Sequence, residues 1–221
     1  MKKLLFVPLL LLLMSMNQQK KAKIIFFGDS ITQMGAGKGG YIDRIQNNIN
    51  EKGLQNNYEL IGSGVENDKI YDLYLRMDDD VMAKEPTVVV INTGINDVAH
   101  KYSTHTGTDI DKYEKFYEAV IKKLQTKNIK VFLCTSTLIG EKKDNGNPQD
   151  EELNAYSNVV RKLAKNMKCG LIDLRKIFTA YEKANNRNNI EKGILTTDGI
   201  HLNDTGNQLI ADIMIRDMSI Q

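Results

Sequence analysis

Short apolar segments alternate with segments of helical periodicity along most of this chain, and few folds accommodate that alternation. The apolar segments are rich in β-branched and aromatic residues and cover residues 23–27, 58–61, 87–91, 130–134 and 171–173. Apolar residues recur at helical spacing over residues 41–52, 70–82 (a broken helix), 109–127, 151–167, 174–185 and 204–218. Strands that alternate with helices form right-handed βαβ units. The pattern predicts an α/β fold, a three-layer α/β/α sandwich with a five-stranded parallel sheet.

The first residues differ in character from the rest of the chain. Lys2 and Lys3 precede an apolar run over residues 4–14, and the chain turns polar at residues 15–19. A basic start followed by about 7–15 apolar residues is typical of a secretory signal peptide, whereas a membrane span needs about 20. We therefore expect residues 1–19 to be a signal peptide and the protein to be exported (periplasmic or secreted) without a stable membrane anchor. The alternative is a buried first helix.

Residues 20–221 are predicted to form a single domain. The chain has 221 residues, 41% of them hydrophobic and 26% charged, which suits one core of that size. The net charge is +2 and no long basic block exists, which argues against nucleic-acid binding. Cys134 and Cys169 are expected to stay free and largely buried, because on parallel neighbouring strands they would lie too far apart for a disulfide.

Polar, turn-forming segments follow three of the predicted strands where each one ends. Gly28-Asp29-Ser30 follows the first strand, residues 62–68 follow the second, and residues 93–97 follow the third. Ligands of open parallel sheets bind beyond the carboxyl ends of the strands. Ser30 can present a nucleophilic hydroxyl there, and Asn96 an uncharged N–H donor for a developing oxyanion. Each segment taken alone is an ordinary turn or helix cap.

A histidine follows an aspartate by three residues just before the last predicted helix. In Asp198-Gly199-Ile200-His201 the chain can fold back so that the carboxylate meets one ring nitrogen and the other nitrogen faces a serine. This is the nucleophile, base and orienting group needed to activate a hydroxyl. The alternative is that Asp198 only begins the helix and His201 packs. Agreement among the four segments favours one shared catalytic site.

Together the segments resemble the blocks of the SGNH/GDSL hydrolases, serine esterases named for Ser, Gly, Asn and His residues. The first block stands here as Gly28-Asp29-Ser30-Ile31-Thr32, the third as residues 94–97 (Gly-Ile-Asn-Asp) and the last as residues 198–202 (Asp-Gly-Ile-His-Leu). Their order and spacing also fit, so the resemblance covers about residues 22–218. It implies the flavodoxin-like SGNH hydrolase fold.

The resemblance also implies roles for individual residues. Ser30 would be the nucleophile, His201 the general base and then acid, and Asp198 the orienting carboxylate. The oxyanion hole would combine the Ser30 backbone N–H, a backbone N–H of the second block and the Asn96 side chain. Asp29 and Gly94, which belong to the first and third blocks, are predicted to contact substrate.

The second block departs from the family pattern. The family usually has Gly-Val-Ser-Gly-Asp/Asn-Thr, whereas this chain has Gly64-Val65-Glu66-Asn67-Asp68-Lys69. Asn67 thus stands in the place of the oxyanion glycine. That glycine acts through its main-chain N–H, so Asn67 can replace it if a left-handed conformation is needed, which Asn tolerates. The alternatives are a weakened hole, or Gly64 or Gly62 in that role.

A glycine-rich stretch and two histidines do not fit the cofactor or metal sites that such residues can form. Residues 35–40 match Gly-x-Gly-x-x-Gly, but the dinucleotide mechanism needs these glycines directly at a strand end, so we expect a flexible wall of the active-site mouth. His100 and His105 are expected to be solvated loop residues, because two histidines without a clear third ligand rarely hold a metal. We therefore predict no metal and no cofactor.

The resemblance implies a carboxylic ester hydrolase. The family includes carbohydrate deacetylases, lysophospholipases, thioesterases and short-chain esterases. Polar loops predicted at residues 141–150 and 185–192, without a long apolar lid, favour a short acyl group such as acetyl on a small-molecule or carbohydrate alcohol. The alternatives are a lysophospholipase or thioesterase type of acylhydrolase, a non-catalytic glycan-binding protein that kept the fold, and a nucleotide-binding α/β domain.

Overall fold

One parallel sheet forms the centre of the protein. The structure, a computed structural model, describes residues 21–221, so the predicted signal segment lies outside the described residues. All four strand pairings are parallel, and the strand order is β2-β1-β3-β4-β5. The strands are β1 (Ala22–Gly28), β2 (Tyr58–Gly64), β3 (Val88–Asn92), β4 (Lys130–Cys134) and β5 (Gly170–Ile172). The predicted fold class is confirmed.

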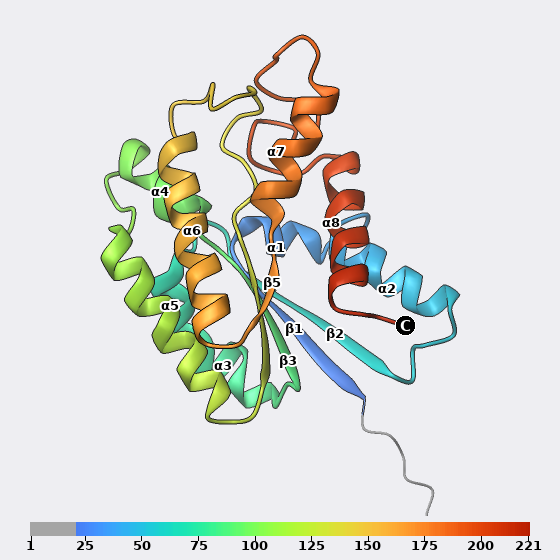
Figure 1. Cartoon of the computed structure of the whole chain (residues 1–221). Coiled ribbons are helices and arrows are strands. Elements are labelled where there is room, and N and C mark those ends of the chain that lie inside the picture. The colour runs from blue at the N-terminus through green and yellow to red at the C-terminus, as the bar shows by residue number, and fades with distance from the viewer. Residues whose placement is uncertain (1–20) are drawn as a thin grey trace, which may run out of the picture.

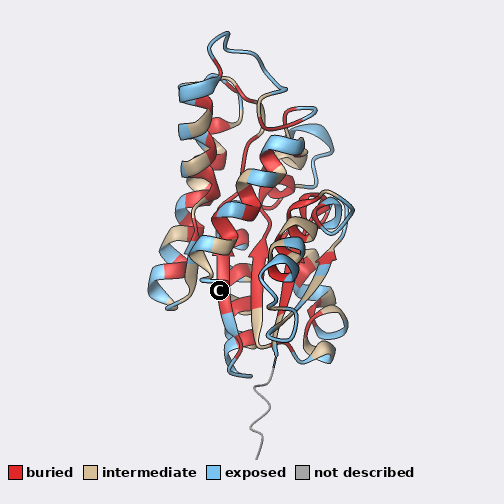
Figure 2. Cartoon of the chain, turned by 90° about the vertical axis from the view of Figure 1, so that its right-hand side faces the viewer, coloured by how far each residue is buried: buried red, intermediate tan, exposed pale blue. Residues whose placement is uncertain are grey.

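Helices cover both faces of the sheet because successive strand residues point to opposite sides. Ile25 and Phe27 of β1 belong to one core, and Ile24 and Phe26 belong to the other. The first face is covered by α3 (Ile70–Asp80), α5 (Ile110–Gln125) and α6 (Asp150–Asn166), and the second by α2 (Tyr41–Glu51), α7 (Leu174–Asn185) and α8 (Asp204–Asp217). Figures 1 and 2 show the strands buried between these two layers. No helix within this part of the chain is long and apolar enough to cross a bilayer.

Two helices were not predicted, and both begin directly after a strand. These are α1 (Ser30–Gly35), which follows β1, and α4 (Ile95–Ser103), which follows β3. His100, which was expected in a loop, therefore lies within α4, and the loop that carries His105 begins only after Ser103. The predicted break in the helix over residues 70–82 is confirmed, since α3 gives way to a short 3₁₀ helix at Met82–Lys84.

Neither cysteine forms a disulfide, as predicted. Cys134 is aligned with Ile172 of β5, three residues beyond Cys169. Cys134 is buried, whereas Cys169 is only partly so. Burial raises the pKa of both thiols, that of Cys169 to about 11, so both are neutral at physiological pH.

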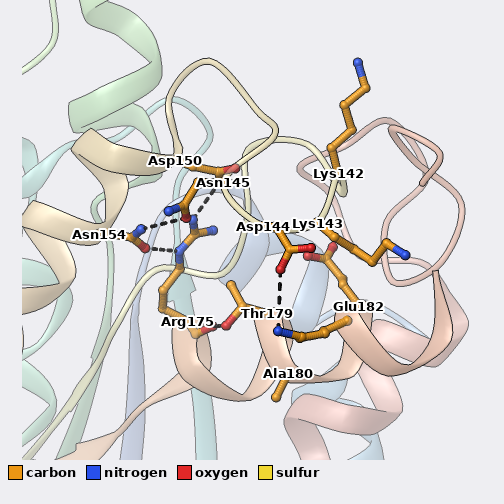
Figure 3. Close-up of a pocket in the computed structure, with 11 residues that line it drawn as sticks. Lys142, Lys143, Asp144, Asn145, Asp150, Asn154, Arg175, Thr179, Ala180 and Glu182 are labelled. Atoms are coloured by element: carbon orange, nitrogen blue, oxygen red, sulfur yellow. Dashed lines mark hydrogen bonds and ion pairs between the residues drawn. The ribbon is translucent and has the colours of Figure 1, made fainter. Parts of the chain in front are cut away.

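A buried ion pair joins the starts of α6 and α7 beside the loop of residues 141–149 (Figure 3). Arg175 Nη2 donates to Asp150 Oδ1 at 2.7 Å, and each side chain is 3% exposed. Arg175 also donates to Asn154 Oδ1 at 2.8 Å and to the Thr137 carbonyl at 3.2 Å. Asp150 Oδ2 in turn accepts the backbone N–H of Asn147 at 2.9 Å. The pair thus fixes a loop that borders the active-site pocket described below.

Replacing Arg175 with methionine is expected to lower the free energy of unfolding by about 3–5 kcal/mol, because Asp150 would keep a buried charge without its partner. Urea unfolding followed by circular dichroism measures the change. Arg216→Met is the matched control. Its partner is Asp217, and the Arg216 side chain is 66% exposed, so it should cost less than about 1 kcal/mol. A similarly small loss for Arg175→Met would contradict a structural role for the buried pair.

Candidate active site

The ends of β1, β2 and β3 lie side by side, because Gly28 is aligned with both Gly64 and Asn92. A side chain at Gly28 would not fit, since its Cβ would lie 2.2 Å from the Asn92 carbonyl oxygen. The chain turns from Gly28 directly into α1, whose first residue is Ser30. The starts of α1 and α4 therefore meet at the carboxyl edge of the sheet, at the point where the strand order reverses (Figure 1).

Ser30, His201 and Asp198 form one continuous chain of hydrogen bonds. Ser30 Oγ lies 3.0 Å from His201 Nε2, and His201 Nδ1 lies 2.7 Å from Asp198 Oδ2. Because an ionised carboxylate only accepts hydrogen bonds, the ring proton belongs on Nδ1. The Nε2 lone pair then faces the serine hydroxyl and can take its proton. The structure brings Ser30 to His201, which follows it by 171 residues in the sequence, while Asp198 and His201 are only three residues apart.

Asp198 is held in its ionised form. Its partial burial acts to raise the pKa, but hydrogen bonds from the His201 ring and from two backbone N–H groups outweigh burial and lower the pKa to about 2. The backbone donors are Ile200 at 2.9 Å and His201 at 2.8 Å, both to Oδ1. Asp198 is therefore ionised at physiological pH and keeps the proton on Nδ1.

Two amide groups reach the same pocket as Ser30. Asn96 lies in the first turn of α4, and its Nδ2 donates to the Asp68 carbonyl at 3.1 Å, which leaves the second amide hydrogen available. Asn67 has a φ of 67°, the left-handed conformation considered for it above. Both line the pocket, whereas Gly64 packs under α1 against Gln33 and Gly62 packs against Ala36. Of the second-block candidates, only Asn67 is placed at the pocket.

Arg76 of α3 ties the Asn67 loop to the ends of two strands, a role that no local sequence pattern indicates. Its Nε donates to Asp68 Oδ2 at 2.6 Å, and its Nη2 donates to the Gly28 carbonyl at 2.9 Å. Nη1 reaches Ser63 Oγ at 3.2 Å, and the guanidinium lies 4.5 Å from the centre of the Phe27 ring. One side chain thus fixes β1, β2 and the segment that carries Asn67.

The pocket around these groups has a volume of about 500 Å³, within the range of small-molecule sites. Its remaining walls come from the second block, from α4, from the segment after β4 and from the turn before His201. The side chains that complete it are Glu66, Ala99, His100, Tyr102, Ser103, Ile139, Gln149 and Ile200. Most of these residues are polar, but most of the surface that they expose to the pocket is apolar.

His100 was expected in a solvated loop, but it lies on α4 and faces the pocket. Burial, followed by the charge of Lys69, lowers its pKa. The imidazole is therefore neutral at physiological pH and can both donate and accept hydrogen bonds. The sequence signal that marks His100 is its spacing of four residues from Asn96, which places both on one helix face.

The structure gives Asp29 and Gly94 no place in the pocket lining, contrary to the prediction. Asp29 is buried and caps α1 by accepting the Ile31 N–H at 3.0 Å, and burial raises its pKa to about 7. Gly94 has a φ of 132° where the chain enters α4. Residues 35–40 connect α1 to α2 and do not line the pocket either, so their prediction as a wall of its mouth is wrong.

His105 is exposed, as predicted. Among residues 21–221, no group of three or more His, Cys, Asp or Glu side chains is arranged to hold a metal ion.

The parallel sheet, with the Ser30, Asn96 and His201 blocks around one pocket at its carboxyl edge, defines an α/β esterase of the SGNH type. The chain matches the GDSL-like lipase/acylhydrolase family over residues 26–209 and belongs to that family. The resemblance inferred from the four blocks is thus confirmed.

Similar proteins include several esterases. A solved acetyl xylan esterase, AlAXEase, is 59% identical, with a TM-score of 0.87 over 88% of this chain and 98% of that one. An acetylxylan esterase of Geobacillus stearothermophilus is 24% identical over 90% of this chain and 94% of its own length. The solved Axe2 acetylxylan esterase of that organism shares the fold, with 21% identity and a TM-score of 0.80 over 92% of this chain and 97% of its own. The chain is a carboxylic ester hydrolase.

Proposed function

We propose that this esterase removes acetyl groups from a carbohydrate, with Ser30 as nucleophile, His201 as base and Asp198 as its orienting partner. The observation that carries the catalytic part is the unbroken path from Ser30 Oγ through His201 to the Asp198 carboxylate, with spacings of 3.0 and 2.7 Å. These spacings lie within the range required for proton transfer between a nucleophile and its base.

In the proposed reaction, Ser30 Oγ attacks the ester carbonyl while His201 Nε2 takes its proton. The carbonyl oxygen becomes an oxyanion, which the N–H groups of Ser30 and Asn67 and the free Asn96 amide hydrogen stabilise. Collapse of this intermediate breaks the ester bond, and His201 returns the proton to the leaving alcohol. Water, activated in turn by His201, then attacks the acetyl-Ser30 ester and releases acetate.

The substrate part rests on the relatives and on the pocket. The 59% identical protein is an acetyl xylan esterase, and the G. stearothermophilus relative has the same description. Beside its apolar surface the pocket offers hydrogen-bonding side chains, among them Glu66, His100 and Gln149, which suit a hydroxylated alcohol. Together these observations favour an acetylated sugar over a lysophospholipid or a fatty thioester.

The proposal is tested by comparing acetate release from acetylated xylo-oligosaccharides with hydrolysis of p-nitrophenyl acetate, butyrate and octanoate. We expect rapid deacetylation of the sugar and a steep fall in kcat/KM with acyl length among the nitrophenyl esters. Octanoate cleaved as fast as acetate, with acetylated sugar untouched, would point instead to a lipase-type acylhydrolase.

A further inference from the structure

One face of α4 forms a wall of the active-site pocket. Asn96, Ala99, His100 and Ser103 follow the i, i+3, i+4, i+7 spacing of a single helix face, and all four line the pocket. Tyr102 stands at the edge of the same face and also lines the pocket. The helix that places Asn96 near the reacting carbonyl therefore also carries side chains that can contact the alcohol part of the ester.

Tyr102 is the more exposed of two aromatic side chains that the described residues present to solvent, at 62%. Its hydroxyl donates to Glu152 Oε2 at 2.8 Å, and the other oxygen of Glu152 accepts from Lys101 Nζ at 2.6 Å. The ring is thus open to solvent but tied to α6 at its far end. A side chain already fixed in one position loses little conformational freedom when a ligand covers it.

The position of Tyr102 along the helix fits the size of a sugar. It lies six residues after Asn96, which corresponds to about 9 Å along the axis of α4. A pyranose ring with its acetyl ester spans a comparable length. The C–H groups on one face of a pyranose pack well against an aromatic ring, while the hydroxyls at its edge need hydrogen-bonding partners. His100, Glu66 and Gln149 line the same pocket and can supply them.

We propose that Tyr102 is the stacking platform for the sugar ring that carries the ester, and that it determines the preference of this esterase for a sugar alcohol. This inference rests on the proposed function. It adds a specificity-determining residue outside the blocks from which the family was recognised. Tyr102 acts on the leaving alcohol and leaves the chemistry at the carbonyl to Ser30 and His201.

The other exposed tyrosine provides a matched control. Tyr74 is 37% exposed and packs on Phe116, with a centroid separation of 5.6 Å, and Lys123 Nζ lies 5.9 Å from its centroid. It does not line the pocket. Tyr74→Ala therefore removes an exposed ring of the same kind without touching the proposed sugar site.

The test compares two substrates that share the acetyl group and differ in the alcohol: an acetylated xylo-oligosaccharide and ethyl acetate, both followed by acetate release. Tyr102→Ala is expected to lower kcat/KM for the sugar ester about five- to tenfold, mainly through KM, the order expected for losing one ring contact. Its kcat/KM for ethyl acetate should stay within about twofold of wild type, because that alcohol does not reach the ring. Tyr102→Phe keeps the ring and should retain most of the sugar preference.

Several results would overturn the proposed role of Tyr102. Equal losses on both substrates would show that Tyr102 supports the site as a whole, and no loss on either would show that the sugar does not contact it; both results overturn the inference. A loss of the same size in Tyr74→Ala would overturn it as well. If the wild-type enzyme cleaves ethyl acetate but no acetylated sugar, the proposed carbohydrate substrate fails, and the platform fails with it.

Discussion

Ser30→Ala is expected to lower kcat for acetyl ester hydrolysis by about 10⁶, the order seen when the nucleophile of a Ser-His-Asp unit is removed. His201 would keep its bond to Asp198 but would have no hydroxyl to deprotonate. The remaining rate would come from water attacking an ester held by the oxyanion donors. Steady-state acetate release, measured at high enzyme concentration to detect the residual rate, gives the number.

Ser157→Ala is the matched control for this variant. Ser157 lies on α6, is buried, and its Oγ has no hydrogen-bond partner within residues 21–221. Its hydroxyl can therefore be removed without breaking a bond, and activity should equal that of wild type. Thermal unfolding of both variants shows whether the fold is intact. A Ser30→Ala protein that keeps more than about one hundredth of wild-type activity would contradict the assignment of the nucleophile.

Asn96→Ala is expected to lower kcat by about 10²–10³ with a much smaller change in KM, because an oxyanion donor acts mainly in the transition state. The second amide hydrogen of Asn96 is the one free to bind the developing oxyanion. The variant also loses the bond from Asn96 Nδ2 to the Asp68 carbonyl, which holds the Asn67 loop in place. Initial rates over a range of p-nitrophenyl acetate concentrations separate kcat from KM.

Asn67→Gly tests whether Asn67 acts through its main-chain N–H or through its side chain. If Asn67 acts through its main-chain N–H, glycine supplies the same donor and adopts a φ of 67° without strain. The variant is expected to keep most of the wild-type turnover, in contrast to Asn96→Ala. A loss as large as that of Asn96→Ala would assign the function to the Asn67 side chain. Full activity of Asn96→Ala would remove Asn96 from the oxyanion hole.

The sheet and its principal helices could be predicted from the sequence because their residues are buried on known faces. Strand β4 and helix α7 have the predicted bounds, and the remaining predicted elements differ from the observed ones by a few residues at their ends. Hydrophobic periodicity reports the face of an element that packs against the core. It therefore locates elements whose apolar face lies on the sheet.

The same reasoning explains why α4 was missed. Its regular stripe is Asn96, Ala99, His100 and Ser103, which is polar or small because it faces the pocket rather than the core. Helix α1 has only six residues, too few to show a period. The functional surface thus lies on elements that hydrophobic patterning does not detect, so His100 was assigned to a solvated loop and Tyr102 was overlooked.

Interactions between distant segments could not be predicted from local patterns. Arg76 joins Gly28, Ser63 and Asp68, which lie on separate segments and meet only once the sheet has formed. The prediction for Asp29 failed for a related reason, because proximity to Ser30 along the chain does not show which way a side chain points. Asp29 turns inward and caps α1. The four blocks succeeded because they are tied to the ends of strands, where parallel topology brings side chains together.

The central claim, that Ser30 is an activated nucleophile, is tested most directly by treating the protein with a serine-directed organophosphate and mapping the adduct by mass spectrometry. We predict one adduct per chain, located on Ser30, with esterase activity lost in proportion to labelling and no adduct in Ser30→Ala. An adduct on a different serine, or none at all in a protein that still hydrolyses acetyl esters, would contradict the assignment.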